Sequence, residues 1–229
     1  MECSNMLYNH KLYLQRSDIL LNAAFESLPE DKRRLIIDVC MEEFARNGYE
    51  KASTNTIVKN AGISKGILFH YFGSKKNLYL YVLDYAIEVF TDKFYEISSD
   101  VPADLIDRII YYGIGKLKLY YEYPQVSKII MDAFLNIPQE LKSEVMERYQ
   151  KVYEQNIPIL IKEIDKTKFR DGIDRDKAVE LVIMCMEGMN IKYINMFKSH
   201  PERMANMDEV FNEIKEYFEI LKGGLYRSI

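Results

Sequence analysis

Residues 53–78 predict two short helices joined by a glycine turn. Ser53 or Thr54 can cap the first helix, because a short hydroxyl side chain accepts a hydrogen bond from the free amides of the opening turn. Gly62 follows the last apolar residue of that helix, where a left-handed residue ends a helix at least steric cost. Ser64 can cap the second helix. The segment therefore has the layout of a helix-turn-helix.

The second of these helices, residues 64–72, has two unlike faces. Leu68 and Phe72 are four residues apart and are expected to face inward. The residues expected near the outer side are Lys65, Gly66, Phe69, His70 and Tyr71. The ring of Tyr71 suits a core position as well as a contact position. A helix with its first turn exposed can enter the major groove of DNA.

Charge supports a DNA-binding role for the same segment. From Lys51 to Leu83 there are five lysines and no acidic residue, although the whole chain has a formal net charge of −4. Residues 31–81 hold nine Lys or Arg against five Asp or Glu, a balance of +4, which leaves −8 for the remainder. A phosphate backbone attracts the first part and repels the second.

The chain as a whole is expected to be all-α. Its 10 glycines and 6 prolines fall where helices begin or turn, and strand patterns are weak. Ser27 and Glu30 predict a capping box for the first long helix, and Asp174 a cap for a late one. Pro158 is expected to kink or break a helix that runs from Pro138 towards Thr167. The remaining expected helices cover residues 75–97, 102–123, 124–136, 174–199 and 207–221.

Composition excludes several classes of protein. Hydrophobic residues make up 48% of the chain, and no apolar run approaches the ~18 residues that span a bilayer. Three distant cysteines suit a reducing compartment, so we expect a cytoplasmic protein without a signal peptide or membrane contact. The three histidines are scattered, and no metal-ligand spacing, phosphate-binding glycine loop or nucleophile motif is present. We expect no cofactor, no metal site and no catalytic residues.

The segment from about Asp31 to Leu83 resembles the DNA-binding domain of TetR-family transcriptional regulators. The matching positions are Phe44, Gly48, Tyr49, Thr54, Ala61, Gly62, Ile63, Ser64, Gly66, Leu68, Phe69, Tyr71, Phe72, Lys75 or Lys76, and Leu78. Ile67 and Phe69 depart from the family, which often has threonine and tyrosine there. The resemblance implies an amino-terminal three-helix DNA-binding domain and a larger helical ligand-binding and dimerisation domain.

The resemblance also implies which residues touch DNA. Thr54, Thr56, and Lys75 or Lys76 correspond to phosphate contacts, a role that helix amino-termini suit. The groove-facing surface corresponds to Lys65, Gly66, Phe69, His70 and Tyr71. We therefore expect double-stranded DNA as a partner, read as a near-palindromic operator by a homodimer.

The carboxy-terminal half suggests two further sites. Helices apolar on more than one face predict a dimer interface that includes Tyr193, Phe197, Phe211, Ile214 and Phe218. Abundant tyrosine and methionine predict a pocket for a mostly apolar small-molecule effector, with Tyr111, Tyr112, Met186, Glu187, Met189 and Asn190 as candidate lining residues. Core packing is the alternative for each of these residues.

The expected organisation is an extension over residues 1–28, either a helix or a disordered arm, a DNA-binding domain over 29–83 and a ligand-binding and dimerisation domain over 84–229. The expected function is a dimeric transcriptional regulator, most simply a repressor that a small molecule releases from DNA. Two alternatives remain. One is a helical adaptor that binds only protein, and the other is an enzyme using the carboxy-terminal domain.

Overall fold

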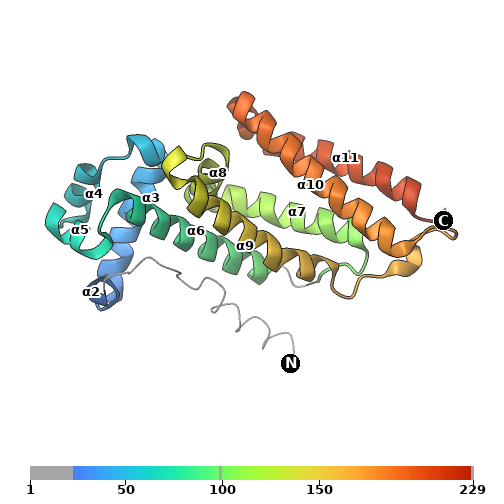
Figure 1. Cartoon of the computed structure of the whole chain (residues 1–229), viewed down its shortest axis with the longest axis horizontal. Coiled ribbons are helices and arrows are strands. Elements are labelled where there is room, and N and C mark those ends of the chain that lie inside the picture. Colours follow the sequence, from blue (N-terminus) through green and yellow to red (C-terminus); the bar gives the residue numbers. More distant parts are fainter. Residues whose placement is uncertain (1–22, 98–99, 228–229) are drawn as a thin grey trace. The chain divides into compact units, whose positions relative to one another are not determined.

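The regular structure of this protein is helical throughout the described residues, which are 23–97 and 100–227 of the computed structural model (Figure 1). No strand forms among them, and the β-type pairing found there is an isolated bridge between Phe169 and Tyr226. The prediction of an all-α fold is confirmed. Residues 1–22, most of the expected amino-terminal extension, lie outside the described residues.

The described helices fall into two compact units. Unit 1 takes residues up to 95 together with 122–147, and unit 2 takes 96–121 together with the residues from 148 onwards. Both units use chain that follows residue 83, so this division does not coincide with the domain boundary expected from the sequence. Each unit is described separately below.

Unit 1 contains the helix-turn-helix segment and the helices that support it. Its elements are α2 (Ala23–Glu26), α3 (Glu30–Lys51), α4 (Thr54–Ala61), α5 (Lys65–Phe72), α6 (Lys75–Ile97, up to residue 95), α8 (Pro124–Leu135), η2 (Gln139–Leu141) and the start of α9 (Lys142–Ile161). The helix α3 packs on both α4 and α8. Its direction changes at Gly48, which has φ +64°.

The core of unit 1 is aromatic and dense. Phe25 of α2 is fully buried, and its ring centroid lies 5.4 Å from Tyr71, 4.8 Å from Phe72 and 5.6 Å from Tyr81. The thiol of Cys40 is buried in the same unit, and burial raises its pKa to about 12. The short helix α2 therefore contributes Phe25 to the core of unit 1, a position that no local sequence pattern predicted.

Unit 2 is built from long helices. They are α7 (Leu105–Glu122, up to residue 121), the rest of α9, η3 (Lys166–Lys168), α10 (Arg175–Ser199), η4 (Pro201–Asn206) and α11 (Met207–Leu225). Within the unit, α10 and α11 run side by side (Figure 1). The central cluster of buried side chains is Leu105, Ile106, Ile109, Leu160, Val182 and Phe218.

A buried arginine closes one end of this cluster. The guanidinium of Arg108 donates to the carbonyls of Pro102, Leu160 and Lys162 at 2.7, 2.9 and 2.6 Å, and its side chain is almost fully buried. The bonds to Leu160 and Lys162 satisfy carbonyls in and just after the last turn of α9, where helix carbonyls lack partners within the helix. Arg108 thus ties α7 to the last turn of α9.

Two expected helix ends differ from those observed. Ser27 donates its hydroxyl proton to the Ala24 carbonyl at 2.9 Å and does not cap α3, which begins after Pro29 without a side-chain cap. The helix expected to reach Thr167 ends at Ile161, shortly after Pro158. The helix continues through Pro158, and the chain then leaves it by a turn at Glu163, which has φ +53°. The capping box and the longer helix were wrong predictions.

The predicted cap at Asp174 is confirmed. Its carboxylate accepts from the amides of Asp176 and Lys177 at 3.0 and 3.1 Å, and these bonds lower its pKa.

Across the described ranges, no helix combines the length and apolar content needed to cross a membrane.

Candidate nucleic-acid interface

The first motif helix, α4, is held at its amino-terminus by two side chains. The hydroxyl of Ser53 accepts from the Thr56 amide at 3.3 Å, so Ser53, not Thr54, is the cap. The Ser53 amide in turn donates to Oε1 of Glu43 at 2.8 Å. Glu43 is a buried residue of α3 and also accepts from Asn47 at 2.9 Å. A buried carboxylate thus fixes where α4 starts on α3.

The turn between the motif helices has the predicted glycine geometry. Gly62 lies at φ +64° and ψ +30°, a left-handed conformation that L side chains rarely adopt. The following amide, that of Ile63, donates to the Val58 carbonyl at 3.1 Å and closes the end of α4. Ser64 then caps α5 by accepting from the Ile67 amide at 3.2 Å. These local contacts fix the entry to α5.

The helix α5 has a buried face and an open face. Leu68 and Phe72 lie on the buried face, as predicted, and are 1% and 3% exposed. Lys65, Gly66 and His70 are exposed, and Phe69 is half-buried. A side chain at Gly66 would meet nothing closer than the Ser64 hydroxyl at 3.8 Å, so the first turn of α5 is open to an approaching ligand.

Tyr71 does not lie on this open face. It is only 9% exposed, and its ring packs on Phe25 in the core of unit 1. The structure therefore places Tyr71 with the core residues, the second of the two positions that its sequence pattern allowed.

The predicted phosphate contacts differ in exposure and in whether their side chains already have hydrogen-bond partners within the protein. Thr56 is exposed and Thr54 half-buried at the start of α4. Lys75 donates to the Glu50 carbonyl at 3.0 Å and lies 5.1 Å from the centre of the Tyr49 ring. Lys76 donates to the Glu140 carbonyl at 3.0 Å and pairs with Glu144.

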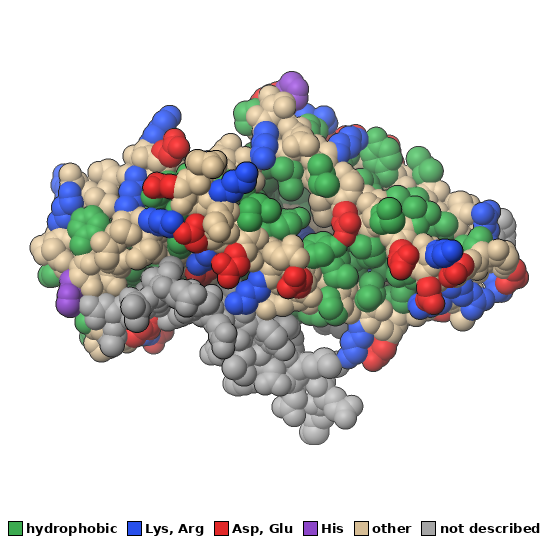
Figure 2. All heavy atoms as spheres, in the orientation of Figure 1, with side chains coloured by type: hydrophobic (Ala, Val, Ile, Leu, Met, Phe, Trp, Pro, Cys, Tyr) green, Lys and Arg blue, Asp and Glu red, His purple; other side chains and the backbone are tan. Residues whose placement is uncertain are grey.

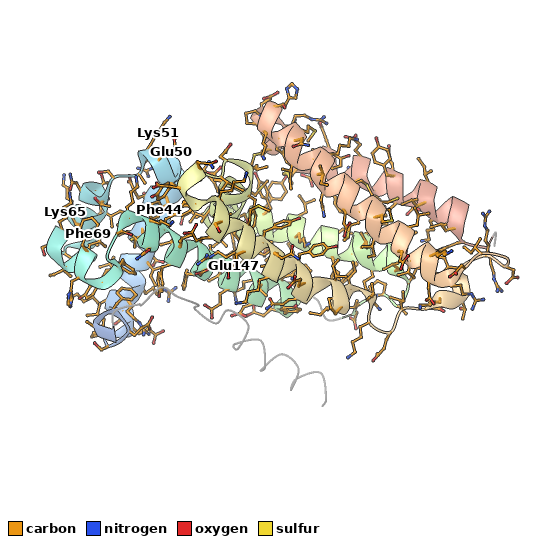
Figure 3. All side chains as sticks on the ribbon, viewed as in Figure 1. Phe44, Glu50, Lys51, Lys65, Phe69 and Glu147 are labelled. Atoms are coloured by element: carbon orange, nitrogen blue, oxygen red, sulfur yellow. The ribbon has the colours of Figure 1, made fainter. Side chains whose placement is uncertain are left out.

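Two lysines that were not among the predicted DNA contacts are more exposed than Lys75 and Lys76. Lys51 ends α3 and Lys59 lies in the last turn of α4, and both side chains are exposed. Figure 3 shows Lys51 and Lys65 projecting from α3 and α5, with Phe69 next to Lys65 on α5. The Nζ of Lys65 lies 5.9 Å from the Phe69 ring centre. The sequence count of lysines included Lys51 and Lys59, but nothing in their local pattern marked them as contacts.

The predicted pocket residues lie in unit 2. Tyr112, Met186 and Met189 pack at the edge of its central cluster. Glu187 accepts a hydrogen bond from the Tyr153 hydroxyl, and Asn190 is exposed. Tyr111 lies on another side of α7, where its hydroxyl donates to the Ile97 carbonyl at 3.4 Å.

The predicted interface residues mostly face the interior of unit 2. Tyr193, Phe197 and Phe218 are buried, and Phe211 and Ile214 are half-buried. The large apolar side chains that remain open on α10 and α11 are Leu181, Met184, Ile191, Tyr217 and Ile220. We call these five residues the outer apolar face. Figure 2 shows hydrophobic side chains exposed over this part of unit 2. No group of His, Cys, Asp and Glu suited to a metal ion occurs in the described part of the chain.

Comparison with known proteins agrees with the geometry of unit 1. Residues 36–82 match the family model described as bacterial regulatory proteins of the tetR family. The HTH-type transcriptional regulator YuxN of Bacillus subtilis is 41% identical over 56 residues, which are 24% of this chain and 19% of YuxN. YerO, an HTH-type transcriptional regulator of the same organism, is 25% identical over 205 residues, or 86% of this chain and 67% of YerO. This chain thus spans about a fifth of YuxN and two thirds of YerO.

Solved structures show the same fold over most of the chain. A TetR transcriptional regulator from Chloroflexus aurantiacus superposes with a TM-score of 0.58 at 21% identity, covering 83% of this chain and 95% of that one. FadR from Bacillus subtilis, solved in complex with stearoyl-CoA, gives a TM-score of 0.53 at 16% identity, covering 81% and 96%.

Proposed function

We propose that this chain, which belongs to the TetR family of bacterial regulatory proteins, is a dimeric repressor that leaves its operator when a mostly apolar small molecule binds. The observation that carries the DNA-binding part is the open side of α5, where Lys65 and Gly66 of the first turn and His70 of the last turn are exposed. It lies in a segment of five lysines without an acidic residue. We also propose a cytoplasmic location, because the DNA that it would bind lies there.

The proposed DNA contacts divide into two kinds. Lys65, Gly66, Phe69 and His70 would face base edges in the major groove, where lysine can reach guanine and histidine can donate or accept. The proposed phosphate contacts are Thr54, Thr56, Lys75 and, with fewer free donors, Lys76. Lys51 and Lys59 join this second set because their side chains are exposed.

We propose that two copies associate through the outer apolar face. Met184, Ile191 and Ile220 are 65%, 62% and 72% exposed, although large apolar side chains gain free energy when removed from water. Leu181, Met184 and Ile191 are spaced three and seven residues apart and share one stripe of α10. A second copy of the same stripe gives the two-fold symmetry that a near-palindromic operator requires. Phe211 and Ile214 of α11, also predicted for the interface, have half-buried side chains.

The proposed effector pocket lies inside unit 2. Tyr112, Met186 and Met189 supply adaptable apolar surface, and Glu187 and Asn190 supply polar groups. FadR of Bacillus subtilis was solved with stearoyl-CoA, so a helical domain of this fold can hold an acyl compound. The effector releases DNA only to the extent that it binds the DNA-free arrangement more tightly.

In terms of domains, we propose residues 29–83 as the DNA-binding domain and 84–229 as the ligand-binding and dimerisation domain. The burial of Phe25 against Phe72 adds the last residues of the 1–28 extension to the DNA-binding domain. Unit 1 as a folded body also includes α8, which packs on α3.

Fluorescence anisotropy with labelled DNA from upstream of the gene tests the proposal. We expect the protein to bind one near-palindromic segment at least about tenfold more tightly than a shuffled duplex of equal length. Equal binding to both duplexes, or to neither, would contradict a sequence-specific regulator and favour an adaptor that binds only protein.

A further inference from the structure

Ile67 is a large apolar side chain that unit 1 leaves open to water. It lies on α5 and is 40% exposed, whereas the next residue, Leu68, is 1% exposed. Among the described residues of unit 1, the other exposed large apolar side chains are Leu35 of α3 and Met146 of α9. Ile67 is therefore the exposed large apolar residue of the two motif helices.

The position of Ile67 on α5 borders the most open part of the helix. With 100° between successive residues, Gly66 and His70 lie nearly opposite the buried Leu68. Ile67 lies on one flank of this pair. A side chain at Gly66 would meet nothing closer than the Ser64 hydroxyl at 3.8 Å. A bound duplex can therefore approach the backbone of α5 at Gly66, which brings the Ile67 side chain towards the base edges.

The opposite flank of α5 is of another chemical kind. It holds Lys65 and Phe69, and the Nζ of Lys65 lies 5.9 Å from the Phe69 ring centre (Figure 3). A lysine on this flank can donate to guanine or to phosphate. The open side of α5 thus has a cationic flank and, beyond Gly66, an apolar flank made by Ile67.

The Ile67 side chain is held in a defined position. Its backbone amide donates to the Ser64 hydroxyl at 3.2 Å, which fixes the residue in the capped first turn. A β-branched side chain in a helix has one strongly preferred χ1 rotamer. Ile67 therefore loses little side-chain entropy when it contacts a ligand.

An isoleucine side chain cannot read the hydrogen-bonding groups of a base pair, since it has neither donor nor acceptor. The apolar group on the major-groove edge of the base pairs is the 5-methyl group of thymine, whereas cytosine presents an amino donor on that edge. Removing a methyl group and an exposed isoleucine together from water is favourable. The chemistry of Ile67 therefore selects thymine.

We propose that Ile67 is a specificity-determining residue that packs on the 5-methyl group of one thymine in each half-site of the operator. This inference rests on the proposed function, because it names a base that the same interface selects. The contact is apolar and adds no charge, so it is independent of the lysines that attract the phosphates. A dimer places two Ile67 side chains on one operator, and each replacement in a symmetric operator counts twice.

Replacing thymine by uracil in synthetic operator duplexes tests the inference. Uracil lacks the 5-methyl group and keeps the hydrogen-bonding groups of thymine. In the near-palindromic segment that the protein binds, one symmetric pair of thymines is replaced at a time. Fluorescence anisotropy then gives the affinity of each duplex for wild type, Ile67→Ala, Leu35→Ala and Lys59→Ala. Thermal melting checks that each variant is folded.

Two of these variants are controls. Leu35→Ala also truncates an exposed apolar side chain of unit 1, but on α3 and outside the motif helices. Lys59→Ala removes an exposed cation of α4 and leaves Ile67 in place. Leu35→Ala should behave as wild type, and Lys59→Ala should weaken binding to all duplexes by the same factor.

We expect one symmetric pair of uracils to weaken wild-type binding at least about tenfold, because one methyl contact is lost in each half-site. Ile67→Ala should bind the thymine operator at least about tenfold more weakly than wild type and should lose almost nothing more with uracil. The double-mutant cycle between Ile67 and the methyl groups separates their contact from any effect of uracil on the shape of the duplex.

The same data separate this inference from the function on which it rests. Wild-type binding that is equal for thymine and uracil at every position, or a uracil effect that persists in Ile67→Ala, would overturn the inference and leave a sequence-specific regulator. A protein that binds no duplex more tightly than a shuffled one loses the proposed function and the inference together.

Discussion

Units 1 and 2 arrange charge and apolar surface in opposite ways. In unit 1 aromatic rings fill the interior around Phe25, and lysines such as Lys59 and Lys65 lie on the outside. In unit 2 a charged side chain, Arg108, is buried, while Ile191 and Ile220 are open to water. Unit 1 thus has a dense interior and an outer surface suited to an anionic partner. Unit 2 instead has an outer surface that is partly apolar.

The largest expected effect is the cost of a cavity in the aromatic core of unit 1. Phe25→Ala should lower the free energy of unfolding by about 3–5 kcal/mol, because a fully buried phenylalanine is removed from a packed aromatic cluster. Urea unfolding followed by circular dichroism measures the loss. Leu35→Ala, at a residue of α3 that is 50% exposed, is the control and should change little. A change below about 1 kcal/mol for Phe25→Ala would show that α2 is not part of the core.

A charge placed on the outer apolar face tests whether two copies associate through it. Ile191→Glu should raise the dimer dissociation constant at least about a hundredfold, since each tenfold is about 1.4 kcal/mol and an unpaired buried charge costs more than that. Sedimentation velocity over a range of concentrations measures it. Leu35→Glu adds the same charge to an exposed residue of unit 1 and should leave the dimer intact. A dimer equally stable in both variants would place the interface elsewhere.

The packing of α7 on α11 gives the third test. Gly113→Leu should destabilise the protein by about 1–3 kcal/mol, because the new side chain would overlap the Phe211 ring. Phe211→Ala in the same chain should recover part of the loss, so a double-mutant cycle measures the coupling. Gly223→Leu, where nothing lies within 4 Å, is the control. If the stability changes of Gly113→Leu and Phe211→Ala were additive, the contact between α7 and α11 at these residues would not contribute to stability.

The smallest expected effect concerns Lys116 of α7 in unit 2. Burial lowers the pKa of Lys116 below its ordinary value of 10.5, so the unfolded chain binds more protons than the folded one between the two values. Stability should therefore rise with pH across that window. At pH 7 Lys116→Met should raise the melting temperature slightly, and this gain should shrink above the lowered pKa. A lower melting temperature for Lys116→Met at pH 7 would show that the ammonium stabilises the fold.

The helix-turn-helix could be predicted almost residue by residue, since its determinants are local. Ser64 and Asp174 cap their helices through amides two or three residues away, and Gly62 ends α4 through its own backbone angles. Leu68 and Phe72 follow from helical spacing alone. Such features need no knowledge of the opposing helix.

The residues whose burial could not be decided from the sequence depend on contacts between distant segments. Phe25 is buried by rings more than 45 residues away in the chain, and no local pattern links them. Tyr193 and Phe218 are apolar like Ile191 and Ile220, and only the position of the central cluster decides which pair faces inward.

The salt dependence of operator binding tests the central claim, that the lysine-rich motif of unit 1 reads DNA. The logarithm of the affinity is plotted against the logarithm of salt concentration for wild type, Lys65→Ala and Lys142→Ala, where Lys142 is an exposed lysine of unit 1 outside the motif. We predict a steep negative slope for wild type, a slope smaller by about one or an altered operator preference for Lys65→Ala, and no change for Lys142→Ala. A wild-type affinity that does not depend on salt would contradict the account.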